Sequence, residues 1–404
     1  MSTHTPFQSA RYDAVVAGAR CAGAATAMLL AREGLRVLVV DRGQYGSDTL
    51  STHALMRGAV VQLDRWGLLG RLEAAGTPVV RTTSFHYAER EVRIELQPRD
   101  GIAGLLAPRR SLLDRLLVDA ARAAGAEVVY GLRVCDLVRR DDGRVAGVAL
   151  EDPDGGRFRV TADVVVGADG LHSSVARLAG ADVYQTARHA GGVVYGYFAG
   201  LENDGYHWHF RPGASVGRIP TNDGLTCVFA ATSARRFESE LSRHVAAGFA
   251  RVLAEVAPQL AEAVASLPRA GNLRGFGGQP GFLRRSFGPG FALVGDAGYF
   301  KDPITAHGIT DALRDAELVA CAVLEGSQAA FVRYQELRDA LGHGIFELSD
   351  RIASYDWSLP ELEAMHLALS EEMKRETRAL TARRSLDSAR TAERSAETNC
   401  SALA

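Results

Sequence analysis

The sequence YDAVVAGARCAGAATAMLLAREGLRVLVVD, residues 12–41, decides the fold class. A short valine-rich run ends before a glycine turn, and residues 22–32, rich in alanine and leucine, predict a helix that Gly34 ends. Residues 36–40 (RVLVV) predict a second buried strand that leads into Asp41. A strand, a helix and a second strand within about 30 residues form a βαβ unit, which begins a parallel sheet.

The turn inside this unit runs from Gly18 to Gly23 and has the outline of a dinucleotide-binding loop. The first glycine makes the tight turn, and the last lets helix and strand pack closely, so that a pyrophosphate lies on the helix N-terminus. Asp41 is placed to accept a hydrogen bond from a ribose hydroxyl. Arg20 replaces the usual middle glycine, and the sequence leaves open whether its guanidinium turns to a phosphate or to solvent.

A second motif, VVVGADGLHSSVAR, spans residues 164–177. It predicts a buried strand, a turn at Asp169 and Gly170, and a helix capped by Ser173. This pattern predicts a second strand-to-helix turn beside the same cofactor.

The third motif, FALVGDAG at residues 291–298, ends a buried strand at Asp296. A carboxylate there needs several hydrogen-bond donors, and a polyol chain such as ribitol supplies them. The helix that begins near Gly308 points N–H groups and a positive dipole at what precedes it, which suits the N1/C2=O edge of a reduced flavin. The three motifs together predict one FAD-binding domain.

In order and spacing the motifs resemble the FAD-dependent monooxygenases of the para-hydroxybenzoate hydroxylase type, within a wider group that includes geranylgeranyl reductases and flavin halogenases. The resemblance covers roughly residues 12–335. It implies that Arg42 lies with Asp41 at the AMP ribose and that Arg110 approaches the phosphates. It also implies that the Asp169–Gly170 turn serves FAD and the nicotinamide, that Asp296 holds the ribitol, and that residues 303–308 border the isoalloxazine. The residues predicted to bind the cofactor are Gly18, Arg20, Cys21, Ala22, Gly23, Asp41, Arg42, Arg110, Val134, Asp169, Gly170, Gly295, Asp296, Ala306 and Gly308.

Two further departures from the family pattern concern the chemistry. GDAGYFKDP stands where the hydroxylases usually have GDAAH, and His307 precedes the helix at Gly308. Tentative catalytic candidates are His307, Pro303 and, in the connection after the first βαβ unit, His53. Residues 186–232 are rich in aromatic residues and valine and predict antiparallel strands, on which His207 and His209 share one face and Trp208 takes the other. Tentative substrate-pocket residues are Tyr195, Tyr197, His207, His209 and Arg211.

The predicted fold is therefore α/β: a three-layer Rossmann-like FAD-binding domain with an inserted antiparallel-sheet substrate domain and C-terminal helices. Residues 239–264 predict one helix. The polar stretch after Glu371 predicts either a solvated helix or disorder, without chemistry. The predicted ranges are 1–80, 105–180 and 270–335 for the FAD-binding domain, 81–104 and 181–269 for the substrate domain, 336–370 for the C-terminal helices and 371–404 for the tail.

The amino-acid composition limits which binding partners and which cellular compartment are expected. The chain has 46 basic and 48 acidic residues among 404, so its balance predicts no nucleic-acid partner. Five cysteines without CxxC spacing predict neither a disulfide framework nor a metal site. No apolar run approaches the roughly 20 residues of a membrane span, and the N-terminus lacks a signal pattern, so a cytoplasmic setting is expected.

By the family resemblance, the predicted reaction is hydroxylation of an aromatic or polyketide-like small molecule. NAD(P)H visits transiently to reduce the flavin, and O₂ forms a flavin C4a-hydroperoxide that transfers one oxygen. One alternative is an FAD-dependent reductase of carbon–carbon double bonds, like the geranylgeranyl reductases, and another is a flavin-binding protein without turnover. Halogenation is not expected, because the Trp-x-Trp-x-Ile-Pro stretch of flavin halogenases is missing and neither lysine, Lys301 or Lys374, lies in the position of the halogenase lysine. The sequence does not name the substrate or choose between NADH and NADPH.

Overall fold

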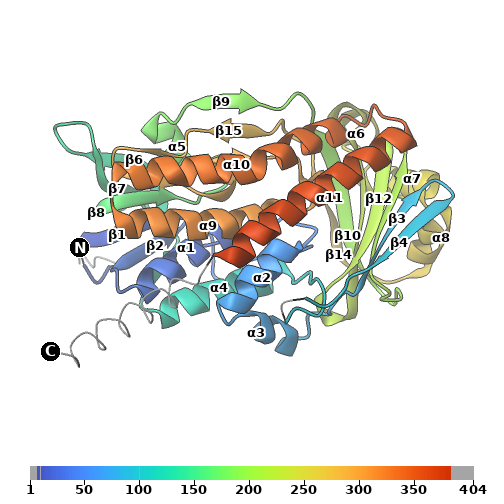
Figure 1. Ribbon diagram of the computed structural model, residues 1–404, viewed down its shortest axis with the longest axis horizontal. Coiled ribbons are helices and arrows are strands. Elements are labelled where there is room, and N and C mark those ends of the chain that lie inside the picture. The colour runs from blue at the N-terminus through green and yellow to red at the C-terminus, as the bar shows by residue number, and fades with distance from the viewer. Residues whose placement is uncertain (1–6, 10, 100, 384–404) are drawn as a thin grey trace.

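The computed structural model describes residues 7–9, 11–99 and 101–383 (Figure 1). Its largest sheet has eight strands, and the first βαβ unit occupies the centre of that sheet. Neighbouring strands from β17 to β5 run parallel. The strands follow the order β16 (Phe287–Gly288), β17 (Phe291–Leu293), β8 (Arg157–Gly167), β1 (Arg11–Ala17), β2 (Val37–Asp41) and β5 (Glu127–Tyr130), while β7 (Val145–Glu151) pairs with β8 and β6 (Arg133–Arg139) pairs with β7.

Both faces of this sheet are buried, which explains the continuous valine and leucine runs of its strands. On one face, Val16 and Val39 pack with the helices α1 (Cys21–Arg32), α4 (Arg110–Ala123) and α9 (Gly308–Glu325). On the other, Val15 and Leu38 pack with β6, β7 and the short α5 (Ser174–Ala179). The prediction of a Rossmann-like α/β fold is confirmed.

A second sheet of seven strands stands beside the first (Figure 1). It joins segments that are far apart in the sequence, because β3 pairs with β11 across more than a hundred residues. Its order is β14 (Arg269–Phe276), β10 (Gly191–Ala199), β13 (Leu225–Ser233), β12 (Ala214–Pro220), β11 (Tyr206–Arg211), β3 (Thr82–Tyr87) and β4 (Arg90–Glu95). The predicted range 270–335 begins inside β14, whereas the structure places that strand in this sheet; the domain division itself stays a prediction.

The outer face of the second sheet is covered by α6 (Ala234–Glu240), α7 (Val245–Val256) and α8 (Pro258–Ser266). The prediction of one helix over residues 239–264 is therefore wrong. Pro258 stands at the first turn of α8, where its missing N–H does no harm, but it could not continue α7. The chain thus turns twice in this segment and folds back over the sheet.

The remaining elements complete the molecule. A three-stranded sheet contains β18 (Tyr299–Phe300), β15 (Phe282–Arg284) and β9 (Val183–Thr186), and two helices, α2 (Arg57–Arg65) and α3 (Leu69–Ala74), follow the first βαβ unit. The long helices α10 (Gln328–Ala353) and α11 (Leu359–Ala382) lie side by side, and α11 also packs on α2. Residues 371–382 of the predicted polar tail belong to α11, and residues 384–404 lie outside the described residues.

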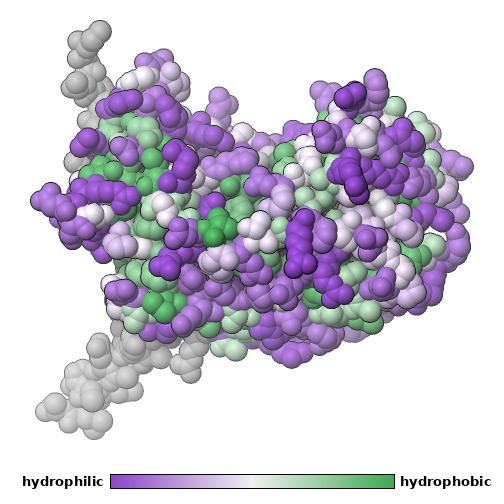
Figure 2. Space-filling view, turned by 90° about the horizontal axis from the view of Figure 1, so that it is seen from above, coloured by the Kyte–Doolittle hydropathy of each residue, from purple (hydrophilic) through white to green (hydrophobic). Residues whose placement is uncertain are grey.

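The surface carries no continuous apolar belt on the face that Figure 2 shows, where hydrophilic side chains dominate and the apolar patches are small and separate. Among the residues that the structure describes, no helix combines the length and the apolar character that a membrane crossing requires. Single exposed apolar side chains such as Leu50 and Leu367 are ordinary for a folded protein.

Candidate functional site

A cavity of about 690 Å³ opens at the carboxyl ends of the parallel strands. The segments after β1, β2, β8 and β17 all reach it, because parallel strands end at the same edge of a sheet. All three sequence motifs therefore meet in one place. The predicted cofactor residues that line it are Gly18, Arg20, Cys21, Ala22, Asp41, Arg42, Arg110, Val134, Asp169, Gly170, Asp296, Ala306 and Gly308.

The two remaining predicted cofactor residues, Gly23 and Gly295, do not line the cavity but pack closely against the glycine turn and the first turn of α1, respectively. A Cβ atom on Gly23 would lie 1.9 Å from the Gly18 carbonyl oxygen, and one on Gly18 would lie 2.3 Å from the Ala168 carbonyl oxygen. Gly18 also has φ +106°, which favours glycine. The loop therefore brings helix α1 as close to the sheet as backbone atoms allow.

Helix α1 presents a free N-terminus to the cavity. Its N-cap residue, Arg20, makes no side-chain capping bond, and Cys21 and Ala22 of its first turn line the cavity. The Asp41 carboxylate accepts hydrogen bonds from the backbone N–H groups of Ala19 at 2.7 Å and Gly43 at 2.6 Å. Uncapped N–H groups suit a diphosphate, and the remaining lone pairs of the carboxylate suit a ribose.

Asp114 on α4 organises the basic groups at this end of the cavity. Arg20 donates to it at 3.0 Å, Arg110 makes a forked pair with it, and the Cys21 thiol donates to it at 3.1 Å. The Arg20 side chain, 36% exposed, thus pairs with protein groups at the cavity wall. Asp114 was missed by the sequence reasoning, although its i,i+4 spacing from Arg110 on one helix could have indicated the pair.

The opposite end of the cavity is formed by the third motif. Helix α9 begins at Gly308 after a 3₁₀ turn, Pro303–Thr305, and its N-cap residue makes no side-chain capping bond. Ala306, between them, has φ +50°. Burial raises the pKa of the Asp296 carboxyl to about 6, although Lys301 and Arg110 act in the opposite direction. A free helix N-terminus, together with an Asp296 carboxyl that forms no ion pair with any residue the structure describes, fits the pyrimidine edge and ribitol of a flavin.

His53 lies at the cavity wall in a strained conformation. Its φ is +69°, its side chain is buried, and its Nε2 lies 2.5 Å from the Tyr197 hydroxyl. Its Nδ1 has no hydrogen-bond partner among the described residues. Burial, together with the Arg109 guanidinium, lowers the pKa of His53 to about 3, so the ring is neutral at physiological pH. Arg109 lies 3.8 Å over the Tyr197 ring and pairs with Asp48, and sequence reasoning missed both charges.

His307, predicted as catalytic, does not line the cavity. Its Nε2 lies 2.5 Å from a carboxylate oxygen of Glu376 on α11, and both side chains are buried. Burial lowers the pKa of the imidazole. Pro303 and His53, the other two catalytic candidates, do line the cavity. Glu376 lies in the stretch predicted to be a solvated helix or disorder, but it is buried within α11 and braces the segment in front of α9.

Of the predicted substrate residues, Tyr195 lines the cavity, and Tyr197 lies behind it against His53. The strand register decides where the others lie. Tyr195, Phe229, Gly217 and Trp208 stand opposite one another on successive strands and share one face. His207, His209 and Arg211 alternate with Trp208 and point to the other face, away from the cavity. Their predicted place in the substrate pocket is therefore corrected.

A family profile described as FAD binding domain matches residues 11–345. The chain belongs to the FAD binding domain family. It is an FAD-dependent oxidoreductase, and the residues around its cavity fit that cofactor: two uncapped helix N-termini, a glycine turn without room for a Cβ atom, and two carboxyl groups.

Several relatives are similar over most of the chain. A digeranylgeranylglycerophospholipid reductase of Methanopyrus kandleri is 31% identical over 374 residues, which cover 87% of this chain and 92% of the relative. The menaquinone reductase of Mycolicibacterium smegmatis is 28% identical over 78% of this chain and 77% of its own length. The monooxygenase cfoF of Aspergillus candidus is 31% identical over 57% of this chain and 59% of its own length.

Solved structures agree on the fold. PqsL of Pseudomonas aeruginosa superposes with a TM-score of 0.76 at 21% identity over 88% of this chain and 99% of that chain. The flavin-dependent brominase Bmp2 gives 0.76 at 19% identity over 96% and 100%. These identities establish the architecture and do not choose among the reactions.

Asp296 offers a direct test of the ribitol end of the site. Asp296→Ala removes a carboxylate that is expected to accept charge-assisted hydrogen bonds worth about 1.5–3 kcal/mol. We expect the variant to bind FAD about ten- to a hundred-fold more weakly in a fluorescence titration of the apoprotein. Asp154→Ala, in the exposed turn between β7 and β8, is the control. Equal affinity of the Asp296 variant and the parent would show that the carboxylate does not contact the cofactor.

Proposed function

We propose that the protein is an FAD- and NAD(P)H-dependent monooxygenase that hydroxylates an aromatic or polyketide-like small molecule. When bound, the flavin supplies the redox chemistry, taking electrons from NAD(P)H and passing them to O₂. The protein contributes binding, orientation and exclusion of water.

One observation carries this proposal: the character of the cavity where it reaches the seven-stranded sheet. There its lining changes from charged groups to Val193, Tyr195 and Phe276, joined by Phe300 from β18. A wall of aromatic and aliphatic side chains favours a flat apolar molecule. The whole cavity measures about 690 Å³ and also contains the cofactor residues.

His53 supplies the polar group that such a pocket needs. Tyr197 holds the ring through Nε2, while Nδ1 is buried and has no hydrogen-bond partner among the described residues, so a substrate would reach it only if the cavity wall at His53 opens. In one tautomer Nδ1 accepts a hydrogen bond from a substrate hydroxyl, and in the other it donates to a substrate oxygen. The strained backbone at His53 is consistent with a residue held in place for binding. We therefore propose His53 as the residue that orients the substrate.

A second candidate, reduction of a carbon–carbon double bond, is favoured by the sequence relatives. The reductases of Methanopyrus kandleri and Mycolicibacterium smegmatis align over 87% and 78% of this chain, whereas the monooxygenase cfoF aligns over 57%. Both reactions use the flavin and NAD(P)H, but hydroxylation adds one oxygen atom to the substrate, whereas reduction adds two hydrogen atoms.

Product mass separates the candidates. Small aromatic and polyketide-like compounds are screened for faster NAD(P)H oxidation by the purified holoenzyme, and accepted compounds are turned over in air with saturating chloride or bromide. We expect a product with one added oxygen atom, formed with consumption of O₂. A product with two added hydrogen atoms, formed equally well without O₂, would establish the reductase instead. A halogenated product would overturn both.

A further inference from the structure

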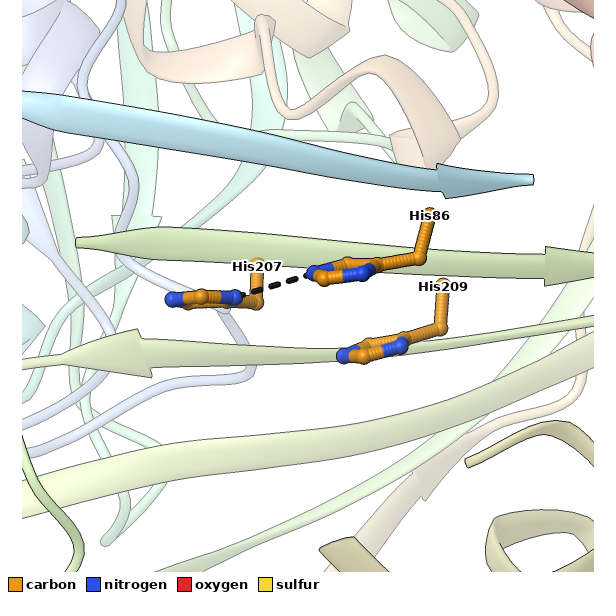
Figure 3. Close-up of side chains that lie close together, drawn as sticks. All are labelled: His86, His207 and His209. Carbon is orange, nitrogen blue, oxygen red and sulfur yellow. Dashed lines mark hydrogen bonds between the residues drawn. The ribbon is translucent and has the colours of Figure 1, made fainter. Parts of the chain in front are cut away.

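Three histidines gather on the face of the seven-stranded sheet that points away from the cavity (Figure 3). His86 comes from β3, and His207 and His209 come from β11. The two strands run parallel with His86 directly opposite His209, so these side chains leave the sheet on the same side. His207 stands two residues before His209 on the same strand, so its side chain leaves the sheet on the same side as that of His209. The strand register thus brings together residues that are 121 positions apart.

The rings lie within reach of one small ion. His86 Nε2 and His207 Nδ1 are 3.1 Å apart, and the rings of His86 and His209 stack with centroids 4.0 Å apart. One ring nitrogen from each of the three lies within 4.8 Å of the other two. All three side chains stand on paired strands, which hold ligands more firmly than loops do. The three rings are stacked, with interplanar angles of 17°, 6° and 18°, so binding one ion requires the rings to rotate until three nitrogens face a common point.

Charged side chains surround the three histidines. Two carboxylates face the group: Asp204 beside His207, and Glu91, the cross-strand partner of His86 on β4.

Asp204 orients His207 for this role. Its carboxylate lies 3.0 Å from His207 Nε2, which leaves Nδ1 directed at the other two rings. Arg218 donates to the same carboxylate at 2.6 Å, and the same guanidinium nitrogen also lies 3.0 Å from His207 Nε2, so Arg218 and Asp204 compete for that ring nitrogen. A carboxylate behind a histidine is the usual support of a metal-binding imidazole, because it fixes the tautomer and raises the basicity of the ligand. The exposed Glu91 carboxylate or a water molecule can complete a fourth position.

We propose that His86, His207 and His209 bind a divalent transition-metal cation, with Zn²⁺ the best match to three imidazoles in tetrahedral geometry. Such an ion links β3 to β11 near the edge of the sheet. The site is separate from the flavin cavity, since Trp208 and Tyr195 mark the opposite face. Cysteine spacing could not reveal it, because no cysteine takes part.

The test uses the holoenzyme without a histidine tag, stripped with EDTA and dialysed. Zn²⁺ is titrated by calorimetry, and Co²⁺ serves as a probe through its ligand-field absorption at wavelengths longer than those of the flavin. We expect one ion per chain with sub-millimolar affinity and Co²⁺ bands typical of tetrahedral coordination. His86→Gln and His209→Gln should abolish both signals, and Asp204→Asn should weaken Zn²⁺ binding about ten- to a hundred-fold.

His343→Gln is the matched control, since His343 is an exposed histidine on α10 that pairs with Glu347. It should bind Zn²⁺ like the parent. All variants should keep the flavin spectrum of the parent, which shows that they fold. The proposal is overturned if the parent binds Zn²⁺ only at millimolar concentration, or if His86→Gln and His209→Gln bind it as tightly as His343→Gln does.

Discussion

Gly23→Ala should leave the protein without FAD. The added methyl group would stand 1.9 Å from the carbonyl oxygen of Gly18 and 3.1 Å from the Cβ atom of Ala168, and the closest of these contacts is to backbone. Helix α1 must therefore move away from the glycine turn, and its free N–H groups move with it. Forced overpacking costs about 1–3 kcal/mol even where side chains can adjust, so we expect at least a hundred-fold loss of FAD affinity at this rigid contact.

The measurement is the flavin content of the purified protein, followed by a fluorescence titration of the apoprotein with FAD. Gly70→Ala is the matched control, because Gly70 is an exposed helical glycine in α3 with no atom within 4 Å of the added methyl group. That variant should bind FAD like the parent. If Gly23→Ala also purified with full flavin, the close approach of helix and turn would not be what positions the diphosphate.

The cofactor end of the site could be predicted because its signals are local. The glycine turn, the two strand-to-helix turns and the carboxylates that end strands are each encoded within a dozen residues, and parallel strands bring their ends to one edge. The same logic covers the fold, since continuous apolar runs identify strands buried on both faces.

What could not be predicted depends on contacts between distant segments. Alternation correctly placed His207 and His209 together, but the face they occupy follows from the register with β12 and β3, which no local pattern contains. Asp48 and Arg109 meet beside His53 only after three separate segments have packed. The place of His307 before α9 predicts a cavity residue, yet its partner Glu376 comes from a stretch whose sequence predicts a solvated helix or disorder.

That partner belongs to a buried ionic network on which the second large effect depends. Arg314 on α9 is fully buried and donates to Asp311, Asp315 and Glu376, each at 2.8 Å. Lys301 pairs with Asp311 from the loop that lines the cavity. The arginine thus neutralises carboxylates from two helices, and α11 is tied through it to the helix whose N-terminus faces the cavity.

Arg314→Met should destabilise the protein by about 3–5 kcal/mol, because it removes the guanidinium that pairs with the buried carboxylates of Asp311, Asp315 and Glu376. We expect a lower urea midpoint with an unchanged m-value, measured on parent and variant at equal FAD concentration. Arg333→Met is the control: Arg333 and its partner Glu325 are about half exposed, and an exposed pair contributes little. Burial alone would raise the pKa of Glu376, but His307 and Arg314 lower it to about 2. The Glu376 carboxylate is therefore ionised at neutral pH, and removing Arg314 takes away one of the positive charges that stabilise it. A midpoint for Arg314→Met equal to that of Arg333→Met would mean that the network adds nothing to stability and that α11 is held by apolar packing on α2 and α10 alone.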